Sequence, residues 1–353
     1  MKAEKAAFEN FTDWLPVRVY WRENRAFVDW CYAGKERFTA PFFEQNVERR
    51  FREPFNLLFR HQTPIEFLGE LNAASAVLAP TGFIFHMSRC GSTLAAQMLA
   101  ALEKNVVMSE PPPVDSILRA NFKNPAVTDE QRIEWLQWII GALGRKRNAE
   151  EEHLFIKFDS WNTLDLALIE RAFPNVPCVF LFRNPVEVIV SHMKQRGAQM
   201  IPGVVDQILP GLDLADVLQM PPEEHCARVL ARICQSMLDF LPRRNILLVN
   251  YTQLPEILTE QITEHFGVVY APEEIETMKN AAQFNAKTPQ MDFVPDSETK
   301  KKEASEAARE AAEKFVNPLY EQLEKFRLAQ QQKKIELARE TREKTLKKKR
   351  KSL

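Results

Sequence analysis

The stretch 82–94 holds residues whose types and order suit the binding of an oxyanion. A short apolar run rich in β-forming residues gives way to a polar turn with glycine, and a helix-compatible segment follows. Backbone N–H groups of such a turn, with those of the helix N-terminus, form a socket for phosphate or sulfate. Arg89 adds a fixed positive charge, and Ser92 and Thr93 add hydroxyl donors.

This loop differs from the phosphate loop of ATPases and GTPases. A Walker A sequence has Gly, four residues and then Gly-Lys-Ser/Thr, whereas here His86 replaces the first glycine and Ser92 replaces the lysine. An ordinary strand-to-helix turn with exposed polar residues is the alternative interpretation. The rest of the chain must decide between the two.

The composition is that of a globular protein without a general affinity for nucleic acid. The chain has 353 residues, of which 45% are hydrophobic and 27% charged, and its net charge is −1. Five scattered cysteines without CxxC spacing favour reduced thiols in a cytoplasmic protein and argue against a metal site. We expect no transmembrane helix and no signal peptide, because no sufficiently long apolar run is present.

Residues 1–78 are expected to form a small cap that contains a β-hairpin. Two alternating apolar and polar runs flank a turn at Glu23 and Asn24, and a helix is predicted over 64–71. Aromatic and basic residues between these elements would also suit a nucleic-acid surface. Interleaved glutamates favour a cap that packs on the main domain instead.

Beyond this cap, short apolar runs alternate with helical segments. The runs lie at 83–87, 106–108, 154–158, 178–182 and 246–249. A helix over 129–147 starts with a capping box of Thr128 and Gln131. Apolar strands separated by helices indicate a parallel sheet covered on both faces. We predict an α/β domain over 79–328, with a mostly parallel five-stranded sheet, and a basic, charged tail over 329–353.

Ligands of open parallel sheets bind beyond the carboxyl ends of the strands, so the residues that follow each run matter most. In chain order they are Ser88 and Arg89, Ser109 and Glu110, Lys157 and Asp159, Arg183 and Asn184, and Asn250 and Tyr251. We therefore expect basic and acidic side chains to converge on one rim of the sheet.

A second phosphate site is predicted after the fourth strand. Asn184 suits the N-cap of a helix and Pro185 its first position, so Arg183 lies at the helix mouth. Ser191 lies in the same helix and can direct a hydroxyl toward the same anion. The alternatives are a salt bridge for Arg183 and an ordinary helix-interior position for Ser191.

At this point two segments resemble a known family. Arg89-Cys90-Gly91-Ser92-Thr93-Leu94 is similar to the phosphosulfate-binding loop of sulfotransferases, and Arg183-Asn184-Pro185 with Ser191 resembles their 3′-phosphate motif. These enzymes use 3′-phosphoadenosine 5′-phosphosulfate (PAPS), a donor with two separated anionic groups. The resemblance covers about 82–320 and implies a P-loop-type, three-layer fold with a C-terminal helical extension.

Other segments resemble the family more weakly. Glu110 stands where the tyrosylprotein and bacterial branches carry a glutamate base, and Lys157 matches a strand-end lysine of those branches. The segment 293–296, followed by Lys300, resembles a loop that covers the donor in bacterial members. Arginine replaces the loop lysine of the cytosolic branch, and its catalytic histidine motif is absent, so the resemblance is to the glutamate-base branches.

The resemblance implies a role for each of these residues. Arg89 and residues 90–94 would hold the phosphosulfate, Lys157 would donate to the bridging oxygen, and Glu110 would take the acceptor proton. The remainder of the donor would be held by Arg183, Ser191 and Lys300. We expect no metal, because the bound cations neutralise the developing charge.

Each assignment has a simpler alternative. Glu110 could cap or pair at the sheet rim, and Lys157 could be an exposed rim lysine. His86 is expected to be a packed strand residue, and Cys90 to be chosen for small size, although Arg89 and a helix mouth could lower the pKa of its thiol.

Composition suggests a role or a structure for two further stretches of the chain. The irregular, apolar stretch 197–222 suggests a lid or a pocket for a small-molecule acceptor, with a packed surface excursion as the alternative. Beyond Lys300 the chain is helical and charged, and Pro318 is expected to divide it. The basic end is typical of a solvated helix, with contact to nucleic acid or an anionic membrane as the alternative.

The favoured hypothesis is a cytoplasmic, PAPS-dependent sulfotransferase that acts on a hydroxyl or amine. A nucleotide-dependent phosphotransferase is the second hypothesis and is disfavoured by the missing loop lysine. A non-catalytic nucleotide-binding or scaffold protein that uses the basic tail is the third.

Overall fold

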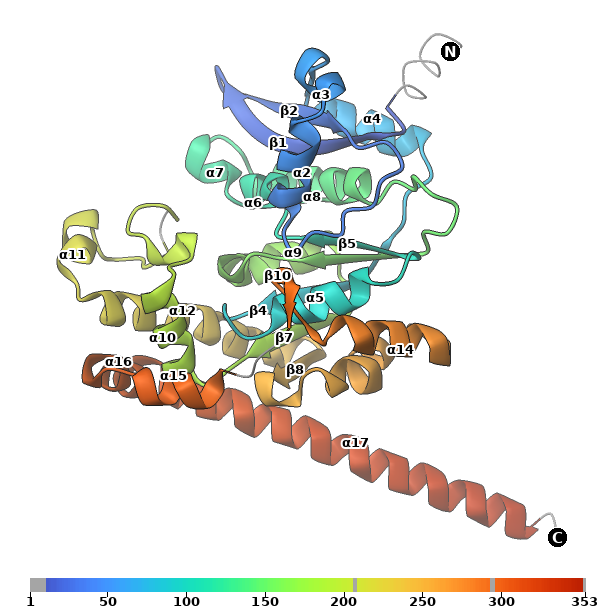
Figure 1. Ribbon diagram of the computed structural model, residues 1–353, viewed down its shortest axis with the longest axis vertical. Helices are drawn as coiled ribbons and strands as arrows, with labels where there is room; N and C mark the ends of the chain where they lie inside the picture. Colours follow the sequence, from blue (N-terminus) through green and yellow to red (C-terminus); the bar gives the residue numbers. More distant parts are fainter. Residues whose placement is uncertain (1–10, 206–207, 293–295, 352–353) are drawn as a thin grey trace.

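The computed structural model describes residues 11–205, 208–292 and 296–351. Its centre is a five-stranded sheet with strand order β5-β6-β4-β7-β8, in which all neighbouring strands run parallel (Figure 1). The strands are β4 (Pro80–His86), β5 (Asn105–Ser109), β6 (His153–Lys157), β7 (Cys178–Phe182) and β8 (Ile246–Asn250). The predicted α/β class and parallel sheet are confirmed, and each predicted strand overlaps an observed one.

Helices lie on both sides of this sheet, which explains why its strands are apolar along their whole length (Figure 1). The helices are α2 (Phe43–Phe51), α3 (Pro54–Leu58), α4 (Glu66–Ala74), α5 (Ser92–Ala100), α6 (Pro112–Leu118), α7 (Ala120–Lys123), α8 (Asp129–Leu143), α9 (Leu166–Ala172), α10 (Pro185–Lys194), α11 (Leu214–Gln219), α12 (Pro222–Phe240), α13 (Thr263–His265), α14 (Pro272–Ala281), α15 (Ser297–Glu303), α16 (Glu306–Ala311) and α17 (Asn317–Lys351). Phe83, Phe85 and Phe158 are fully buried among them, and the last two stack with ring centroids 4.7 Å apart.

The N-terminal part forms a separate antiparallel sheet of β1 (Trp14–Arg22), β2 (Arg25–Tyr32) and β3 (His61–Pro64). The predicted hairpin is confirmed, and its turn residues Glu23 and Asn24 adopt φ of 47° and 65°, as a type I′ turn requires. Strand β1 packs against α6 and α8, so this sheet shares the core of the main domain.

Helix α8 begins as predicted but ends earlier. Thr128 Oγ1 accepts from the Gln131 N–H at 3.3 Å and Gln131 Oε1 accepts from the Thr128 N–H at 3.0 Å, which confirms the capping box. The helix ends at Leu143 rather than at residue 147, because the backbone of residues 144–146 pairs with that of 76–78 instead. The side chains of Arg145 and Arg147 donate to carbonyls of the N-terminal part. These bonds fix the N-terminal part to the sheet.

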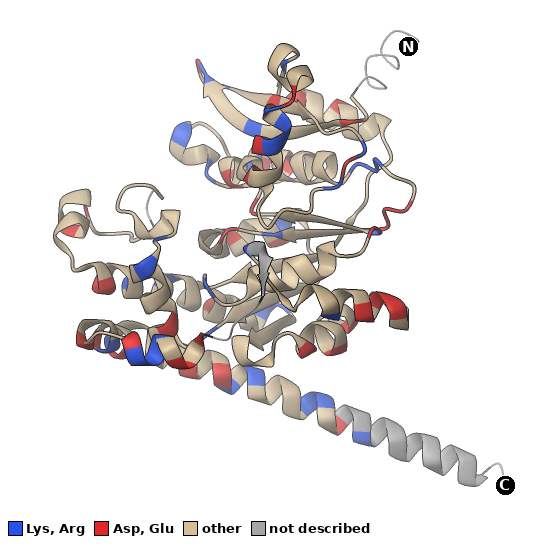
Figure 2. Ribbon diagram, viewed as in Figure 1, with Lys and Arg blue, Asp and Glu red and all other residues tan. Residues whose placement is uncertain are grey.

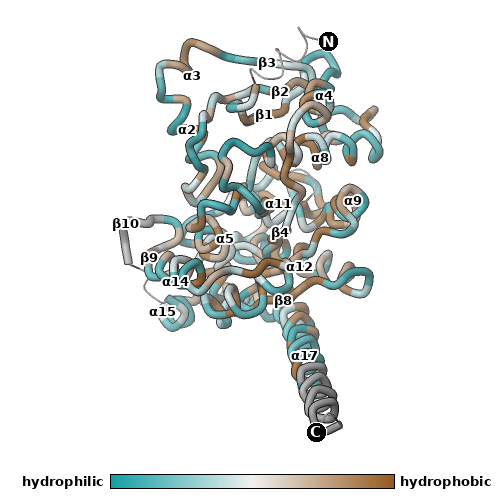
Figure 3. Tube along the Cα trace, turned by 90° about the vertical axis from the view of Figure 1, so that its right-hand side faces the viewer, coloured by the Kyte–Doolittle hydropathy of each residue, from teal (hydrophilic) through white to brown (hydrophobic). Residues whose placement is uncertain are grey.

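The C-terminal helix α17 starts on the domain and then projects from it (Figure 1). Pro318 does not divide the helix as expected: α16 continues through a π-helical turn, Ala312–Val316, into α17, and Pro318 lies in the first turn of α17. Both basic and acidic side chains occur along the described part of α17 (Figure 2), and hydrophilic residues predominate there (Figure 3). Within the described residues, no helix has the length and apolarity needed to span a bilayer.

Gln330 joins α17 to the edge strand of the sheet. Its Nε2 donates to the Ile246 carbonyl at 2.6 Å, and its Oε1 accepts from the Leu248 N–H at 3.1 Å. The side chain therefore satisfies two backbone groups that an edge strand leaves unpaired.

Replacing Gln330 tests this junction. Gln330→Ala should lower the free energy of unfolding by about 1–2 kcal/mol, because two hydrogen bonds to the β8 backbone are lost. Gln332→Ala is the matched control, since Gln332 bonds only to Glu336 on the same exposed helix. Urea denaturation of the two variants should separate them, and equal stability would contradict the proposed junction.

Candidate active site

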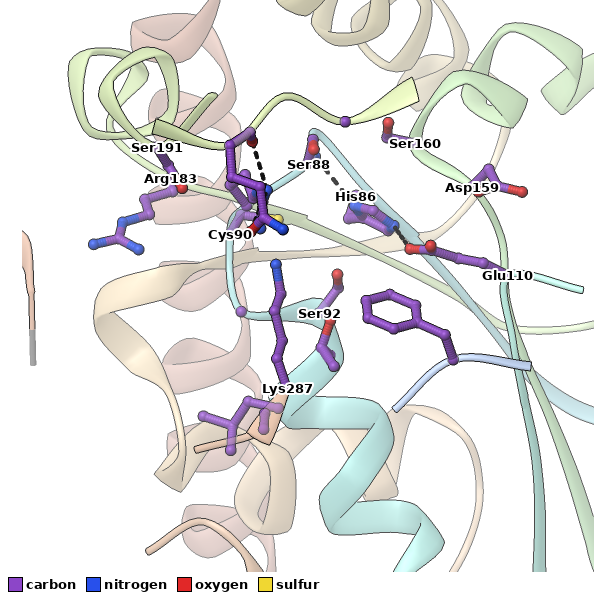
Figure 4. A pocket seen from close by; sticks show the side chains of 18 of the residues that line it. His86, Ser88, Cys90, Ser92, Glu110, Asp159, Ser160, Arg183, Ser191 and Lys287 are labelled. Carbon is purple, nitrogen blue, oxygen red and sulfur yellow. Dashed lines mark hydrogen bonds and ion pairs between the residues drawn. The ribbon is translucent and has the colours of Figure 1, made fainter. Parts of the chain in front are cut away.

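Residues that follow all five strands line a single cavity of about 540 Å³. The predicted site residues that line it are Arg89, Cys90, Gly91, Ser92, Thr93, Leu94, Glu110, Arg183, Ser191 and Lys300. Arg183 and Ser191 lie at one end, and Glu110 and Asp159 at the other (Figure 4). The structure thus brings together the residues that were predicted from their positions after the strands. Lys157 lies directly behind them.

The loop between β4 and α5, residues 88–91, is called the anion loop here and has an unusual backbone. Ser88, Arg89 and Gly91 adopt φ of 86°, 50° and 87°, in the left-handed region. A Cβ atom at Gly91 would lie 2.6 Å from Leu254 Cδ1, so both conformation and space require glycine there. Within the described residues, the N–H groups of Arg89 and Gly91 donate to no acceptor. Together with the start of α5, they form a concave group of donors suited to an oxyanion.

Side chains from three elements hold Ser88 in this strained conformation. His86 Nδ1 accepts from the Ser88 N–H at 3.1 Å. His192 Nε2 and Gln199 Nε2 lie 3.1 Å and 3.0 Å from Ser88 Oγ. The Gly197 N–H donates to His192 Nδ1, so Nε2 carries the proton and donates. Burial lowers the pKa of His192 to about 3, so this imidazole is neutral and positions the loop.

Glu110 is the acceptor for two neighbouring side chains. Lys157, which is fully buried, forms an ion pair with it. His86 Nε2 lies 3.2 Å from its Oε1, and Figure 4 shows these two side chains facing each other. Burial alone would raise the pKa of Glu110, but the charge of Lys157 and the hydrogen bond from His86 outweigh it and lower this pKa to about 2. Glu110 is therefore a carboxylate at any physiological pH.

Lys157 itself does not line the cavity; its ammonium lies behind Glu110, 5.5 Å from the centroid of the Phe42 ring. The alternative of an exposed rim lysine is thereby wrong, because none of this side chain is accessible to solvent. Its predicted donation to a bridging oxygen stays a prediction. His86 is a packed strand residue as expected, but it also orients Glu110.

Arg183 and Lys300 hold one carboxylate, that of Asp296, between them. Arg183 Nη2 lies 2.8 Å from one oxygen of Asp296, and Lys300 Nζ lies 2.7 Å from the other. Glu187 pairs with Arg183 Nε at 2.6 Å, and the guanidinium lies over the Tyr251 ring at 3.9 Å. The helix-mouth ion pair considered above is thus present. Because a carboxylate bridges the two cations, their spacing fits an oxyanion such as phosphate.

The helix that presents this site starts as predicted. Asn184 Oδ1 accepts from the N–H groups of Val186 and Glu187 at 3.1 Å and 3.4 Å, and Pro185 occupies the first helical position. Ser191 lies in the same helix and lines the cavity beside Arg183 (Figure 4). Of the predicted covering segment, residues 293–295 lie outside the described residues.

Cys90 is a structural residue of the loop. Its thiol is buried and donates to the Leu181 carbonyl at 3.1 Å. Burial raises the pKa of this thiol to about 11, so the depressed pKa considered above is absent and the group stays protonated. All five cysteines are free and buried, as the sequence predicted. The described residues contain no group of metal-ligating side chains.

Sequence patterns missed several residues of the cavity wall. Phe42 and Glu44 come from the N-terminal part, Trp161 follows β6, and Lys287 comes from the hairpin of β9 (Phe284–Asn285) and β10 (Thr288–Asp292). Burial and the nearby Arg89 charge lower the pKa of Lys287 to about 8. None of these positions belongs to a short motif, so only the fold identifies them.

The acceptor pocket expected within 197–222 is found only at its start. Residues 197–199 line the cavity, whereas Met200, Val205 and Ile208 are buried in the core. Residues 209–212 border a different groove, of about 480 Å³, with α12 and α17. Five large apolar side chains of this stretch are nevertheless exposed: Ile201, Val204, Leu212, Leu214 and Leu218. Burial in the core therefore accounts for only part of its apolar character.

The sulfotransferase domain model matches residues 80–338. The chain belongs to the sulfotransferase family. The match covers the whole parallel sheet and begins after the N-terminal part. Among the curated proteins compared, none matches this chain by sequence.

Several solved sulfotransferases match this chain at low sequence identity. A sulfotransferase from Alicyclobacillus acidocaldarius is 15% identical, with 71% of this chain and 96% of that chain covered and a TM-score of 0.41. A sulfotransferase domain from the curacin biosynthetic pathway is 16% identical, with 68% and 98% covered and a TM-score of 0.40. A mouse sulfotransferase complexed with PAP is 12% identical, with 75% and 94% covered and a TM-score of 0.37.

The pH dependence of stability tests the pair of Glu110 and Lys157. The folded-state pKa of Glu110 lies below its usual 4.5, so the carboxylate stabilises the fold above about pH 4.5, and this contribution is lost as the pH falls toward about 2. Urea denaturation should therefore show that the stability difference between wild type and Glu110→Gln is constant near neutral pH and shrinks below about pH 4.5. Lys157→Met should abolish the same pH dependence; its persistence would argue against the pair.

Proposed function

We propose that this sulfotransferase-family protein transfers a sulfuryl group from PAPS to an acceptor hydroxyl or amine. The observation that carries the proposal is that one cavity contains two separate groups of donors suited to oxyanions, the loop 89–94 and the pair of Arg183 and Lys300. PAPS carries anionic groups at its 5′ and 3′ positions and fits both. ATP carries its phosphates at one end only and would leave the Arg183 site without a partner.

On the donor side the residues mainly bind and neutralise charge. Arg89 and the N–H groups of residues 90–94 would hold the phosphosulfate, and they would stabilise the phosphate as it leaves. Lys287 lines the same part of the cavity and adds a positive charge. At the other site the 3′-phosphate would take the place of the Asp296 carboxylate between Arg183 and Lys300.

Glu110 would serve as the general base, with Lys157 as the group that controls its basicity. In the transfer, a bond forms between sulfur and the acceptor oxygen or nitrogen, the bond from sulfur to the bridging phosphate oxygen breaks, and the acceptor proton passes to Glu110. A carboxylate with a pKa of about 2 is a weak base while Lys157 is paired with it. A shift of Lys157 toward the bridging oxygen would neutralise the leaving group and make Glu110 more basic at the same moment.

Calorimetry with 3′,5′-adenosine bisphosphate and ATP tests the donor class. We expect wild type to prefer the bisphosphate. Arg183→Met should weaken bisphosphate binding by about tenfold to a hundredfold, because the 3′-phosphate loses its contact with the guanidinium. This range corresponds to the loss of about one or two charge-assisted hydrogen bonds. Binding of 5′-AMP, which lacks the 3′-phosphate, is the matched control and should change little. A preference of wild type for ATP would overturn the assignment.

Substitution of Glu110 tests the base. Glu110→Gln should reduce turnover by about 10²- to 10⁴-fold, since an amide cannot take the acceptor proton. Transfer of the labelled sulfuryl group from radiolabelled PAPS to an acceptor measures this loss. Affinity for 3′,5′-adenosine bisphosphate should stay nearly intact, which separates loss of chemistry from loss of fold. Unchanged turnover would exclude Glu110 as the base.

A further inference from the structure

Helix α3 of the N-terminal part and the residue after it expose a cluster of large apolar side chains. Phe55, Leu57, Leu58 and Phe59 are exposed by 43%, 56%, 77% and 54%, and we call these four residues the α3 patch. They line neither of the two large cavities. Figure 1 and Figure 3 both show α3 at the outer edge of the N-terminal part. Apolar side chains that gather in this way mark a surface for binding.

The fold holds this segment with its polar residue inside. Asn56 is fully buried, and its Oδ1 accepts from the Tyr32 N–H at 2.8 Å. Its Nδ2 donates to the carbonyls of Tyr32 and Arg50 at 2.9 Å and 3.2 Å. A short helix that buries an asparagine and exposes leucines reverses the usual pattern. Three hydrogen bonds therefore fix α3 with its apolar side chains outward.

The two aromatic rings of the patch are also held in place. The Phe55 ring packs on Tyr32 of β2, with ring centroids 4.7 Å apart, and the Phe59 ring packs on Phe55 at 4.8 Å. Each ring is supported on one side and accessible on the other. Side chains that are ordered before binding lose little conformational entropy when a partner covers them.

Three exposed arginines flank the patch in the sequence: Arg49, Arg52 and Arg60. None of them forms an ion pair with another residue that the structure describes. The neighbouring carboxylate of Glu53 pairs with Arg50 instead, at 2.8 Å. The surroundings of the patch are therefore positively charged, with charges left for an anionic partner.

This charge decides between the possible occupants of the patch. In a symmetric dimer each copy would present the same surface, so the arginines would face one another. Glu48 is the exposed carboxylate nearest to them in the chain and could balance only part of this charge. A lipid surface meets both requirements, because its interfacial layer accepts leucine and aromatic side chains and its anionic headgroups attract arginine.

We propose that the α3 patch docks this protein on an anionic lipid bilayer. Leu57, Leu58 and Phe59 would enter the layer between the headgroups and the acyl chains, and Phe55 would lie at its edge. The three arginines would contact the phosphate and carboxylate groups of the lipids. Such a contact is peripheral and reversible, and it is separate from the chemistry of the cavity.

Sedimentation with vesicles tests this docking on the full chain. We expect the partition coefficient to be at least about tenfold higher for vesicles of phosphatidylcholine and phosphatidylserine in equal parts than for phosphatidylcholine alone, because each arginine near an anionic surface contributes about fivefold. High salt should remove most of this difference, since it screens the arginine charges. Equal partition to both kinds of vesicle, or none, would overturn the proposal.

Paired substitutions locate the contact. Leu57→Ser combined with Leu58→Ser should lower the partition coefficient by about tenfold or more, because two side chains are no longer buried in lipid. Leu214→Ser combined with Leu218→Ser is the matched control, since these leucines of α11 are exposed by 54% and 66%. The control should bind as wild type does, and equal losses in the two pairs would contradict the assignment to α3.

The arginines are tested separately. Arg49→Gln combined with Arg52→Gln should weaken binding to the anionic vesicles by about tenfold or more and leave binding to phosphatidylcholine unchanged. Thermal unfolding of all these variants should match wild type, since the altered side chains are exposed.

Two results would replace the proposal with another occupant or another site. Vesicle binding that survives both the leucine and the arginine substitutions would overturn it and assign the lipid contact to the basic sequence 347–351. A dimer in light scattering that dissociates on Leu57→Ser with Leu58→Ser, without vesicle binding, would overturn it in favour of a second copy. Neither result bears on sulfuryl transfer, because the substituted residues do not line the cavity.

Discussion

The buried ion pair between Lys157 and Glu110 is the interaction on which the site depends. In the strand order β5-β6-β4, Lys157 ends the middle strand, while Glu110 follows one neighbour and His86 ends the other. A fully buried ammonium needs a carboxylate at contact distance, and removing one partner of such a pair costs about 3–5 kcal/mol. The pair therefore fixes the position of Glu110 and, through His86, connects it to the anion loop.

The anion loop and the Glu110 carboxylate are held in place by a single connected set of side chains. His86 bonds to Glu110 through one ring nitrogen and to the Ser88 backbone through the other. His192 and Gln199 bond to the Ser88 hydroxyl from beyond β7, so the segment after α10 also supports the loop. The left-handed residues of the loop stay in a costly conformation because these bonds and the packing of α5 determine it.

Local signals in the sequence predicted a large part of this site. The apolar strands, the glycine-containing turn before α5 and the Asn184–Pro185 start of α10 each depend on neighbouring residues, so they could be inferred without a structure. The family resemblance added roles for Glu110 and Lys300. Phe42, Trp161 and Lys287 were not predicted, because only tertiary packing brings the N-terminal part and the β9–β10 hairpin to the sheet edge. The apolar stretch 197–222 was only partly informative, because its residues are divided between the cavity edge, the core and the exposed surface.

The central claim is that two oxyanion sites in one cavity hold the two ends of one donor. A crystal structure with 3′,5′-adenosine bisphosphate tests this claim most directly. It should show the 5′-phosphate on the N–H groups of residues 89–94 and the 3′-phosphate between Arg183 and Lys300, with the Asp296 carboxylate displaced. A bisphosphate bound outside the cavity, or bound with no phosphate at Arg183, would contradict the claim.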